Sequence, residues 1–135
     1  MADPKVINYA GEQKIYNKEK VDELLDKMKQ TEAEQLSGIH CSRFTNLPIA
    51  TIQVNNTDKS VGVGDTIATV SARYLPKIPV DFVMTSVQVT GSASEAYLLM
   101  LRLDTSGNIN VINMVRLANS TSATDTAAVT YITKE

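Results

Sequence analysis

The chain has 135 residues, the length of one domain with a short appendage, and a net charge of −2, which argues against binding nucleic acid through its phosphates. One histidine and one cysteine exclude an intrachain disulfide and most metal sites and catalytic triads. We find no apolar signal core and no run near the roughly 18 apolar residues that span a bilayer. We therefore expect a chain made in a cytoplasm, without a recognisable export signal or membrane insertion.

Residues 1–16 form a leader of mixed composition with scattered apolar side chains. These are Val6, Ile7, Tyr9, Ile15 and Tyr16. Leaders of this kind are usually extended or disordered until they dock on something. Two interpretations stay open: the leader is a plain flexible tail, or these five side chains anchor the protein to a larger assembly.

A single helix is predicted over residues 17–38. Asn17 is a favourable N-cap, and Gly38 can turn the chain out of the helix at its C-terminus. The apolar stripe is narrow and consists of Val21, Leu24, Leu25 and Met28. This width favours the seam of a coiled coil over a helix packed on the β domain of its own chain, which needs a broader apolar face. Only about two heptads follow the pattern, so both interpretations stay open.

Residues 39–135 show the period-two pattern of a β domain. The predicted strands are 49–54, 66–73, 82–90, 96–103, 109–117 and 127–133. The clearest hairpin turn is Asp104–Asn108, whereas Pro76 and Pro79 exclude a central strand between them. We therefore expect a mainly β fold: one N-terminal helix, then a small antiparallel β-sandwich or barrel.

The paired strands 97–103 and 109–117 are apolar on both faces, unlike a hairpin with one wet face. The second face must be covered by another sheet, by the helix or by a neighbouring subunit. Together with the helix stripe, this gives a hypothetical oligomer interface. Its residues are Val21, Leu24, Leu25, Met28, Leu98, Met100, Ile112 and Met114.

Reactive side chains are few, and we predict no catalytic, cofactor-binding or metal-binding residue. His40 and Cys41 are adjacent, but sequence neighbours seldom point at each other as a nucleophile and its base must. The segment from Asp104 to Asn108 begins like a calcium loop but lacks the glycine and glutamate that such a loop needs further on, at positions occupied by Ile109 and Val115. A hairpin turn capped by Asp104 is the simpler interpretation.

The sequence from Leu75 onward resembles the small β domains that close bacteriophage tail-fibre, baseplate and head-fibre or decoration proteins. The residues that carry the resemblance are Leu75, Pro76, Pro79, Asp104, Gly107, Ile109 and Val111. Lys77-Ile78 departs from the family loop, which commonly has a glycine and an aromatic or arginine residue before the second proline. The resemblance implies a homotrimer with an N-terminal helical stalk and a C-terminal β domain, attached to the virion by its leader.

The expected function is therefore that of a non-enzymatic virion structural protein, assembled in the cytoplasm of the bacterial host. Its expected partners are two further copies of itself, other virion proteins bound through the leader, and a host receptor or glycan; nucleic acid is not among them. The alternative is a free-standing β-sandwich module that binds a carbohydrate or a protein. The lack of Trp and the low aromatic content of 5% disfavour a carbohydrate site, because such sites use aromatic platforms.

Overall fold

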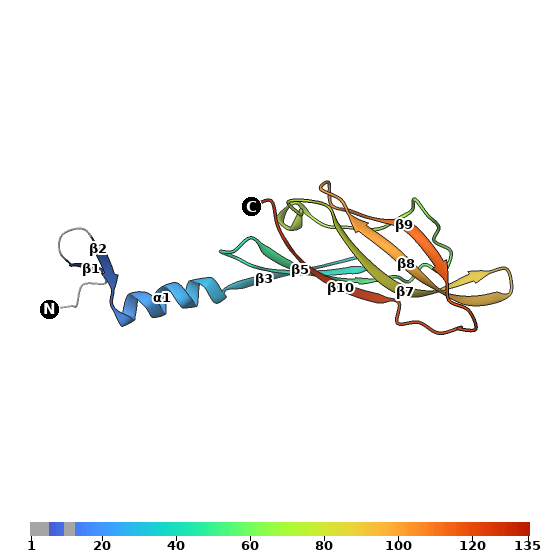
Figure 1. Ribbon diagram of the computed structural model, residues 1–135, viewed down its shortest axis with the longest axis horizontal. Helices are drawn as coiled ribbons and strands as arrows, with labels where there is room; N and C mark the ends of the chain where they lie inside the picture. The colour runs from blue at the N-terminus through green and yellow to red at the C-terminus, as the bar shows by residue number, and fades with distance from the viewer. Residues whose placement is uncertain (1–5, 10–12) are drawn as a thin grey trace.

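The computed structural model describes the backbone of residues 6–9 and 13–16 and the whole of residues 17–135. The molecule is mainly β, with one helix and antiparallel sheets that form a curled half-barrel, so the predicted fold class is confirmed at this level. The helix projects from one end of the β part and makes the molecule long and narrow (Figure 1). We call residues 31–135 the β head.

Helix α1 spans Lys18–Lys29 and has 12 residues. It begins as predicted, because the Asn17 side chain caps it by accepting a 2.9 Å hydrogen bond from the backbone N–H of Lys20. It does not continue to Gly38, so the predicted helix over 17–38 is wrong in its C-terminal part. The Thr45 N–H donates to the Gln30 carbonyl at 2.8 Å, and the Asn46 side chain donates to the Lys27 carbonyl at 2.8 Å. These two bonds tie the end of the helix to residues 45 and 46; the Lys27 carbonyl also accepts from the Gln30 N–H at 3.4 Å.

The residues after the helix form two strands that were not among those predicted from the sequence. Strand β3, Thr31–Leu36, pairs with β4, Ile39–Phe44, and every second residue of β3 is half-buried. Its sequence, TEAEQL, is compatible with a helix by propensity, but cross-strand pairing overrides so weak a preference. Gly38 adopts φ +74° in the turn between the two strands, where it serves a hairpin instead of a helix end.

The other elements of the β head follow the predicted strands closely. They are β5 Ile49–Asn55, β6 Thr66–Thr69, the short 3-10 helix η1 Ala72–Tyr74, β7 Val80–Thr90, β8 Ala93–Leu103, β9 Asn108–Arg116 and β10 Thr126–Ile132. The strand expected over 66–73 thus stops at Thr69. Pro76 and Pro79 lie outside the named strands, as predicted. In the leader, β1 Val6–Tyr9 and β2 Gln13–Tyr16 pair as a small antiparallel hairpin.

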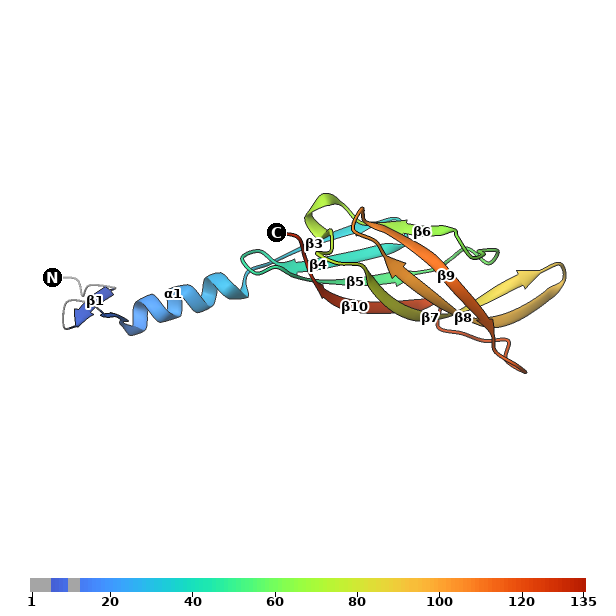
Figure 2. The same ribbon diagram turned by 45° about the horizontal axis from the view of Figure 1, so that its top comes forward.

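Two four-stranded antiparallel sheets make up the β head, with strand orders β10-β5-β4-β3 and β6-β9-β8-β7. They lie against each other, and the β7–β8 hairpin extends beyond them at the end far from α1 (Figure 2). The core between them takes Ile39 and Ile52 from the first sheet and Leu99, Leu101 and Ile109 from the second, all fully buried. This closed core leaves the outer faces of both sheets for other contacts.

The sheets are joined along one side, where β10 runs beside β7. The Lys77 N–H donates to the Ile132 carbonyl at 2.9 Å, and the Asp125 N–H donates to the Thr85 carbonyl at 2.9 Å. On the opposite side, the Ser71 hydroxyl donates to the Glu34 carboxylate at 2.6 Å and ties β3 to the segment after β6. The half-barrel is therefore fastened along both margins.

Candidate subunit interface

The apolar stripe of α1 has no cover from the side chains that the structure describes, those of residues 17–135. Val21, Leu24, Leu25 and Met28 are 37–45% exposed, and no residue of the helix is buried. The interpretation of a helix packed on the β domain of its own chain is therefore wrong for this structure. A helix of 12 residues is marginal in water without tertiary contacts, so these side chains form a candidate contact surface.

A second apolar surface lies on the outer face of the β7–β8–β9 sheet. Met100 is opposite Val83, and Leu98 is opposite Val115. Val83 and Val115 are about half exposed, Met100 is exposed, and Leu98 is half-buried. Two of these side chains, Leu98 and Met100, were in the interface predicted from the sequence. The other two were missed, although each lies at the alternating spacing of its strand.

A β-bulge separates the remaining two predicted interface residues from this surface. The register of β8 and β9 shifts between Met100 and Leu101, which leaves Ile112 as the extra residue of β9. Beyond the bulge Met114 is opposite the fully buried Leu99 and packs against the core. The structure therefore places Met114 on the inner side of its sheet and Ile112, half-buried, at the bulge.

An apolar groove of about 570 Å³ lies where the start of β7 meets the end of β10. Its lining includes Ile78, Pro79, Val80, Tyr131 and Ile132. Ile78 and Ile132 are 69% and 59% exposed, which makes them the most exposed large aliphatic side chains beside β7. Such side chains cost free energy in water until something covers them.

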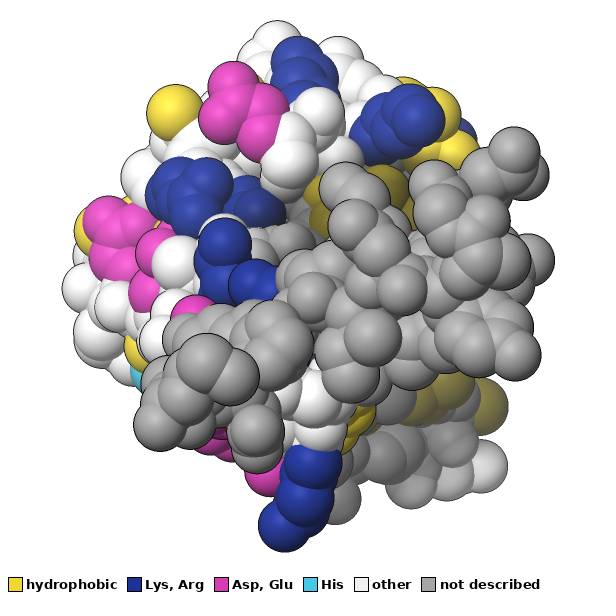
Figure 3. Space-filling view, turned by 90° about the vertical axis from the view of Figure 1, so that its left-hand side faces the viewer, with side chains coloured by type: hydrophobic (Ala, Val, Ile, Leu, Met, Phe, Trp, Pro, Cys, Tyr) yellow, Lys and Arg dark blue, Asp and Glu magenta, His cyan; other side chains and the backbone are white. Residues whose placement is uncertain are grey.

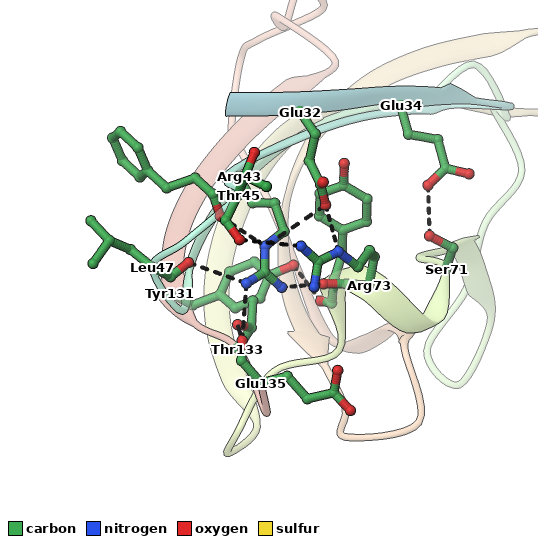
Figure 4. A network of polar contacts seen from close by, with 12 residues as sticks. Glu32, Glu34, Arg43, Thr45, Leu47, Ser71, Arg73, Tyr131, Thr133 and Glu135 are labelled. Atoms are coloured by element: carbon green, nitrogen blue, oxygen red, sulfur yellow. Dashed lines mark hydrogen bonds and ion pairs between the residues drawn. The ribbon is translucent and has the colours of Figure 1, made fainter. Parts of the chain in front are cut away.

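Between α1 and these surfaces, a buried arginine holds the base of the β head together (Figure 4). The Arg43 guanidinium donates to the carbonyls of Arg73 at 2.7 Å, Leu47 at 3.1 Å and Glu135 at 3.0 Å. Its Nε donates to the Phe44 carbonyl at 3.1 Å. The side chain is only 3% exposed, so these carbonyls replace water around the charge.

The same network reaches β3, the strand that follows the helix. Glu32 accepts a hydrogen bond from Arg73 at 2.6 Å and lies 3.9 Å from Arg43 (Figure 4). The buried hydroxyl of Tyr131 donates to the Tyr74 carbonyl at 2.6 Å. Burial raises the pKa of the Tyr131 hydroxyl, which keeps it a neutral donor. The base of the β head is thus tied together immediately beside the helix.

At the far end of the β head, a second polar cluster is buried beneath the 56–61 loop. The Asp125 carboxylate accepts hydrogen bonds from the Ser86 hydroxyl at 2.7 Å and the Val87 N–H at 3.0 Å, and pairs with Lys59 at 2.8 Å. Gln88 and Asn56 both donate to the Ser86 hydroxyl at 3.1 Å. Burial tends to raise the pKa of Asp125, but the hydrogen bonds from Lys59, Ser86 and Val87 outweigh it and lower the pKa.

The structure separates the side chains that carry reactive chemistry. Cys41 is fully buried, whereas His40 lies on the exposed face of β4 and contacts Gln35 at 3.0 Å. Burial, with the nearby Glu34 carboxylate, raises the pKa of the Cys41 thiol to about 11, so it is not a thiolate near neutral pH. His40 and Cys41 therefore do not form a nucleophile and base.

The Asp104 loop is the turn that the sequence favoured. One carboxylate oxygen of Asp104 accepts hydrogen bonds from the backbone N–H groups of Ser106 at 2.9 Å and Asn108 at 3.0 Å, and the other from the Asn110 amide at 3.1 Å. Among residues 6–9 and 13–135, no group of three or more His, Cys, Asp and Glu side chains is placed to hold a metal ion. In the same part of the chain, no helix is long and apolar enough to cross a membrane.

The proposed anchor residues of the leader lie partly within the described structure. The backbone of Val6, Ile7, Tyr9, Ile15 and Tyr16 belongs to the β1–β2 hairpin, which pairs Ile7 with Ile15 and Val6 with Tyr16. Their side chains lie outside what the structure describes, as do residues 1–5 and 10–12 altogether. The two interpretations of the leader, tail or anchor, thus stay as they were.

No protein-family model, curated protein or solved structure matches this chain. The resemblance to phage fibre-type proteins therefore depends on the residues from Leu75 to Val111 named above. On the end of the molecule shown in Figure 3, the described Lys and Arg side chains that are visible are interspersed with Asp and Glu. Such mixed charge on the visible face differs from the basic field that attracts a phosphate backbone.

Proposed function

We propose that this chain is a non-enzymatic structural protein of a bacteriophage virion. In this proposal it forms a homotrimeric fibre, decoration or baseplate-type component, assembled in the cytoplasm of the bacterial host. The observation that carries the proposal is the helix α1, which projects from a β head with its apolar stripe uncovered. A stripe of this width suits the seam between helices of neighbouring copies.

The arrangement of polar groups supports a structural role. The buried guanidinium of Arg43 donates its hydrogen bonds to backbone carbonyls of its own chain. The carboxylate of Asp104 accepts hydrogen bonds from backbone N–H groups of its own turn. Cys41 is buried with a raised pKa, and His40 is on the opposite face. Catalytic groups, in contrast, converge on a common cleft within hydrogen-bonding reach of one another.

The leader gives the proposal its attachment point. The β1–β2 hairpin lies at the end of the molecule opposite the β head, beyond α1 (Figure 1). A two-stranded hairpin alone is marginally stable in water, so we propose that it docks on another virion protein. The exposed loops at the far end of the β head would then point away from the particle, toward solvent or a host receptor.

Light scattering on the full chain is the first test, because the proposal requires three times the mass of one chain. Immunogold electron microscopy then tests the location. It uses an antibody against the chain and particles of the phage whose genome encodes it. We expect gold on the particles at sites repeated with their symmetry. A strictly monomeric protein at all concentrations, or particles free of label, would contradict the proposal.

The alternative, a free-standing binding module, has one observation in its favour. A hollow of about 240 Å³ at the far end of the β head has Tyr97, Gln88 and Lys59 in its lining. The Tyr97 ring offers an aromatic surface, as small carbohydrate sites do, whereas Gln88 and Lys59 are already bonded within the chain. A glycan-binding screen separates the two functions: a monomer that binds one glycan through Tyr97 favours the alternative.

A further inference from the structure

We infer that an apolar stripe on the outside of the β head is buried against a second copy of this chain and supplies more of the subunit contact than the helix does. We call this surface the outer stripe. It consists of Ile78, Val83, Leu98, Met100, Val115 and Ile132. The inference rests on the proposed homotrimer and says which surface holds it together.

The outer stripe runs from the base of the β head to β9, with Asp81 between the groove and Val83. Ile78 and Ile132 share the 570 Å³ groove with Asp81. Asp81 and Val83 are two residues apart on β7 and therefore point to the same face. Register then places Val83 opposite Met100, and Leu98, two residues along β8 on that face, opposite Val115.

One ion pair crosses the outer stripe, and it is already satisfied within the chain. Arg102 donates to both carboxylate oxygens of Asp81, at 2.6 and 2.9 Å. The hydrogen bonds from Arg102 lower the pKa of Asp81, so this carboxylate is charged at neutral pH. A neighbouring subunit can cover a bidentate pair without leaving either charge alone, which is the condition for tolerating charge in an interface.

The apolar surface of the helix is too small to hold the proposed assembly by itself. A fully buried aliphatic side chain removes on the order of 100 Å² from water, by the usual transfer coefficient. The four α1 side chains, 37–45% exposed, therefore offer roughly 170 Å² per chain. A standard interface covers about 800 Å² per partner, of which a little over half, or about 450 Å², is apolar.

The outer stripe supplies the missing area. Its exposed aliphatic side chains are 37–69% accessible and add roughly 270 Å² on the same scale. Helix and outer stripe together therefore reach about the apolar area of a standard interface, whereas neither does so alone. The larger share belongs to the β head.

The junction between α1 and the β head explains why a second copy is the occupant. Only Gln30 separates Lys29 from Thr31, and the bonds from Thr45 and Asn46 hold the end of the helix to the β4–β5 turn. Copies joined through their helices must therefore bring their β heads side by side. An unrelated partner on the outer stripe would leave the stripe and the helix to associate separately.

The test compares full-length variants by analytical ultracentrifugation over a range of concentrations. Val83→Glu combined with Met100→Glu places two charges in the outer stripe, and Gln53→Glu places one on the exposed face of β5, in the other sheet. We expect the double variant to need at least a 100-fold higher concentration for half-assembly, and Gln53→Glu to behave as the unchanged protein. Leu24→Glu on α1 should have a smaller effect than the double variant.

Circular dichroism and thermal melting of each variant show whether the β head is still folded. If the double variant is folded and still trimeric at the lowest concentration, or if Leu24→Glu dissociates the trimer more than it does, the inference is wrong while the proposed function stands. Dissociation by Gln53→Glu would also overturn it. A monomeric unchanged protein removes the proposed homotrimer itself, so the two failures are distinguishable. Assembly of the unchanged chain only with another protein would assign the outer stripe to that partner.

Discussion

At the scale of single residues, glycine occupies turns of this chain where the backbone has a positive φ. Gly107 has φ +94° in the β8–β9 turn, a backbone conformation that residues with a Cβ rarely adopt. A Cβ there would lie 2.9 Å from the Val70 carbonyl oxygen and 2.9 Å from Leu75 Cδ2. Gly91, in the β7–β8 turn, also has a positive φ of +63°, but a Cβ there would have open space around it.

This contrast gives a matched pair of variants. We expect Gly107→Ala to lower the free energy of unfolding by about 3 kcal/mol, because the strain of the turn adds to a backbone clash. Gly91→Ala should cost about 1 kcal/mol, the strain alone. Urea denaturation of both variants measures the difference. Equal losses would show that the segment with Val70 and Leu75 moves aside freely.

Asp125 is the residue from which we expect a pH effect. Its φ of +56° suits Asn as well as Asp, so Asp125→Asn keeps the backbone and removes the charge that pairs with Lys59. The folded protein holds the pKa of Asp125 below its ordinary value. The stabilisation from its charge is therefore present above the unfolded pKa of about 3.9 and is lost as the pH falls through the folded pKa.

We therefore expect Asp125→Asn to lower the free energy of unfolding by about 1–2 kcal/mol at neutral pH. At an acid pH below the folded pKa of Asp125 the two proteins should differ by much less, because the carboxylate of the unchanged protein is then protonated and neither protein carries the charge. Urea denaturation at the two pH values is the measurement. A difference that is the same at both would mean that the hydrogen-bond geometry, and not the charge, stabilises this cluster.

At the scale of elements, Arg43 connects segments that are far apart in the sequence. It joins β4 to η1, to the β4–β5 turn and to the residues after β10 by hydrogen bonds to their carbonyls. Lysine keeps the charge but offers one ammonium group in place of a planar fork. Arg43→Lys therefore leaves some of these carbonyls without a donor in a site that excludes water.

We expect Arg43→Lys to lower the free energy of unfolding by about 2–4 kcal/mol. Arg73→Lys is the control, because Arg73 belongs to the same network but its side chain is 42% exposed; the loss there should stay below about 1 kcal/mol. Thermal and urea unfolding both report the change. A small effect at Arg43 would mean that water enters the site and takes over the hydrogen bonds.

The elements also show what the sequence could and could not predict. Six strands, the helix start at Asn17 and the Asp104 turn were predictable, because alternation, capping and turn residues act locally. Strands β3 and β4 were not, because TEAEQL is compatible with a helix until β4 pairs with it. Met114 was assigned to the wrong face because one bulge residue, Ile112, reverses the alternation, and nothing in the composition of β9 marks it.

At the scale of the whole molecule, the proposed trimer would use α1 and the β head as two weak contacts held in a fixed relation. Gln30 is the only residue between α1 and β3, and two hydrogen bonds fix the junction. In the proposed trimer, pairing of the helices raises the effective concentration of the outer stripes for one another. Assembly therefore depends on the junction as well as on the two surfaces.

Inserting six Gly and Ser residues between Gln30 and Thr31 tests this dependence without changing either surface. The flexible linker lets the β heads move apart and lowers their effective concentration, so we expect assembly to need about a 10- to 100-fold higher concentration. The same insertion between Gly91 and Ser92, in the β7–β8 turn far from α1, is the control and should leave assembly unchanged. Sedimentation velocity measures both proteins. If the junction insertion had no effect, one surface alone would hold the trimer, and the substitutions at Leu24 and at Val83 with Met100 would show which.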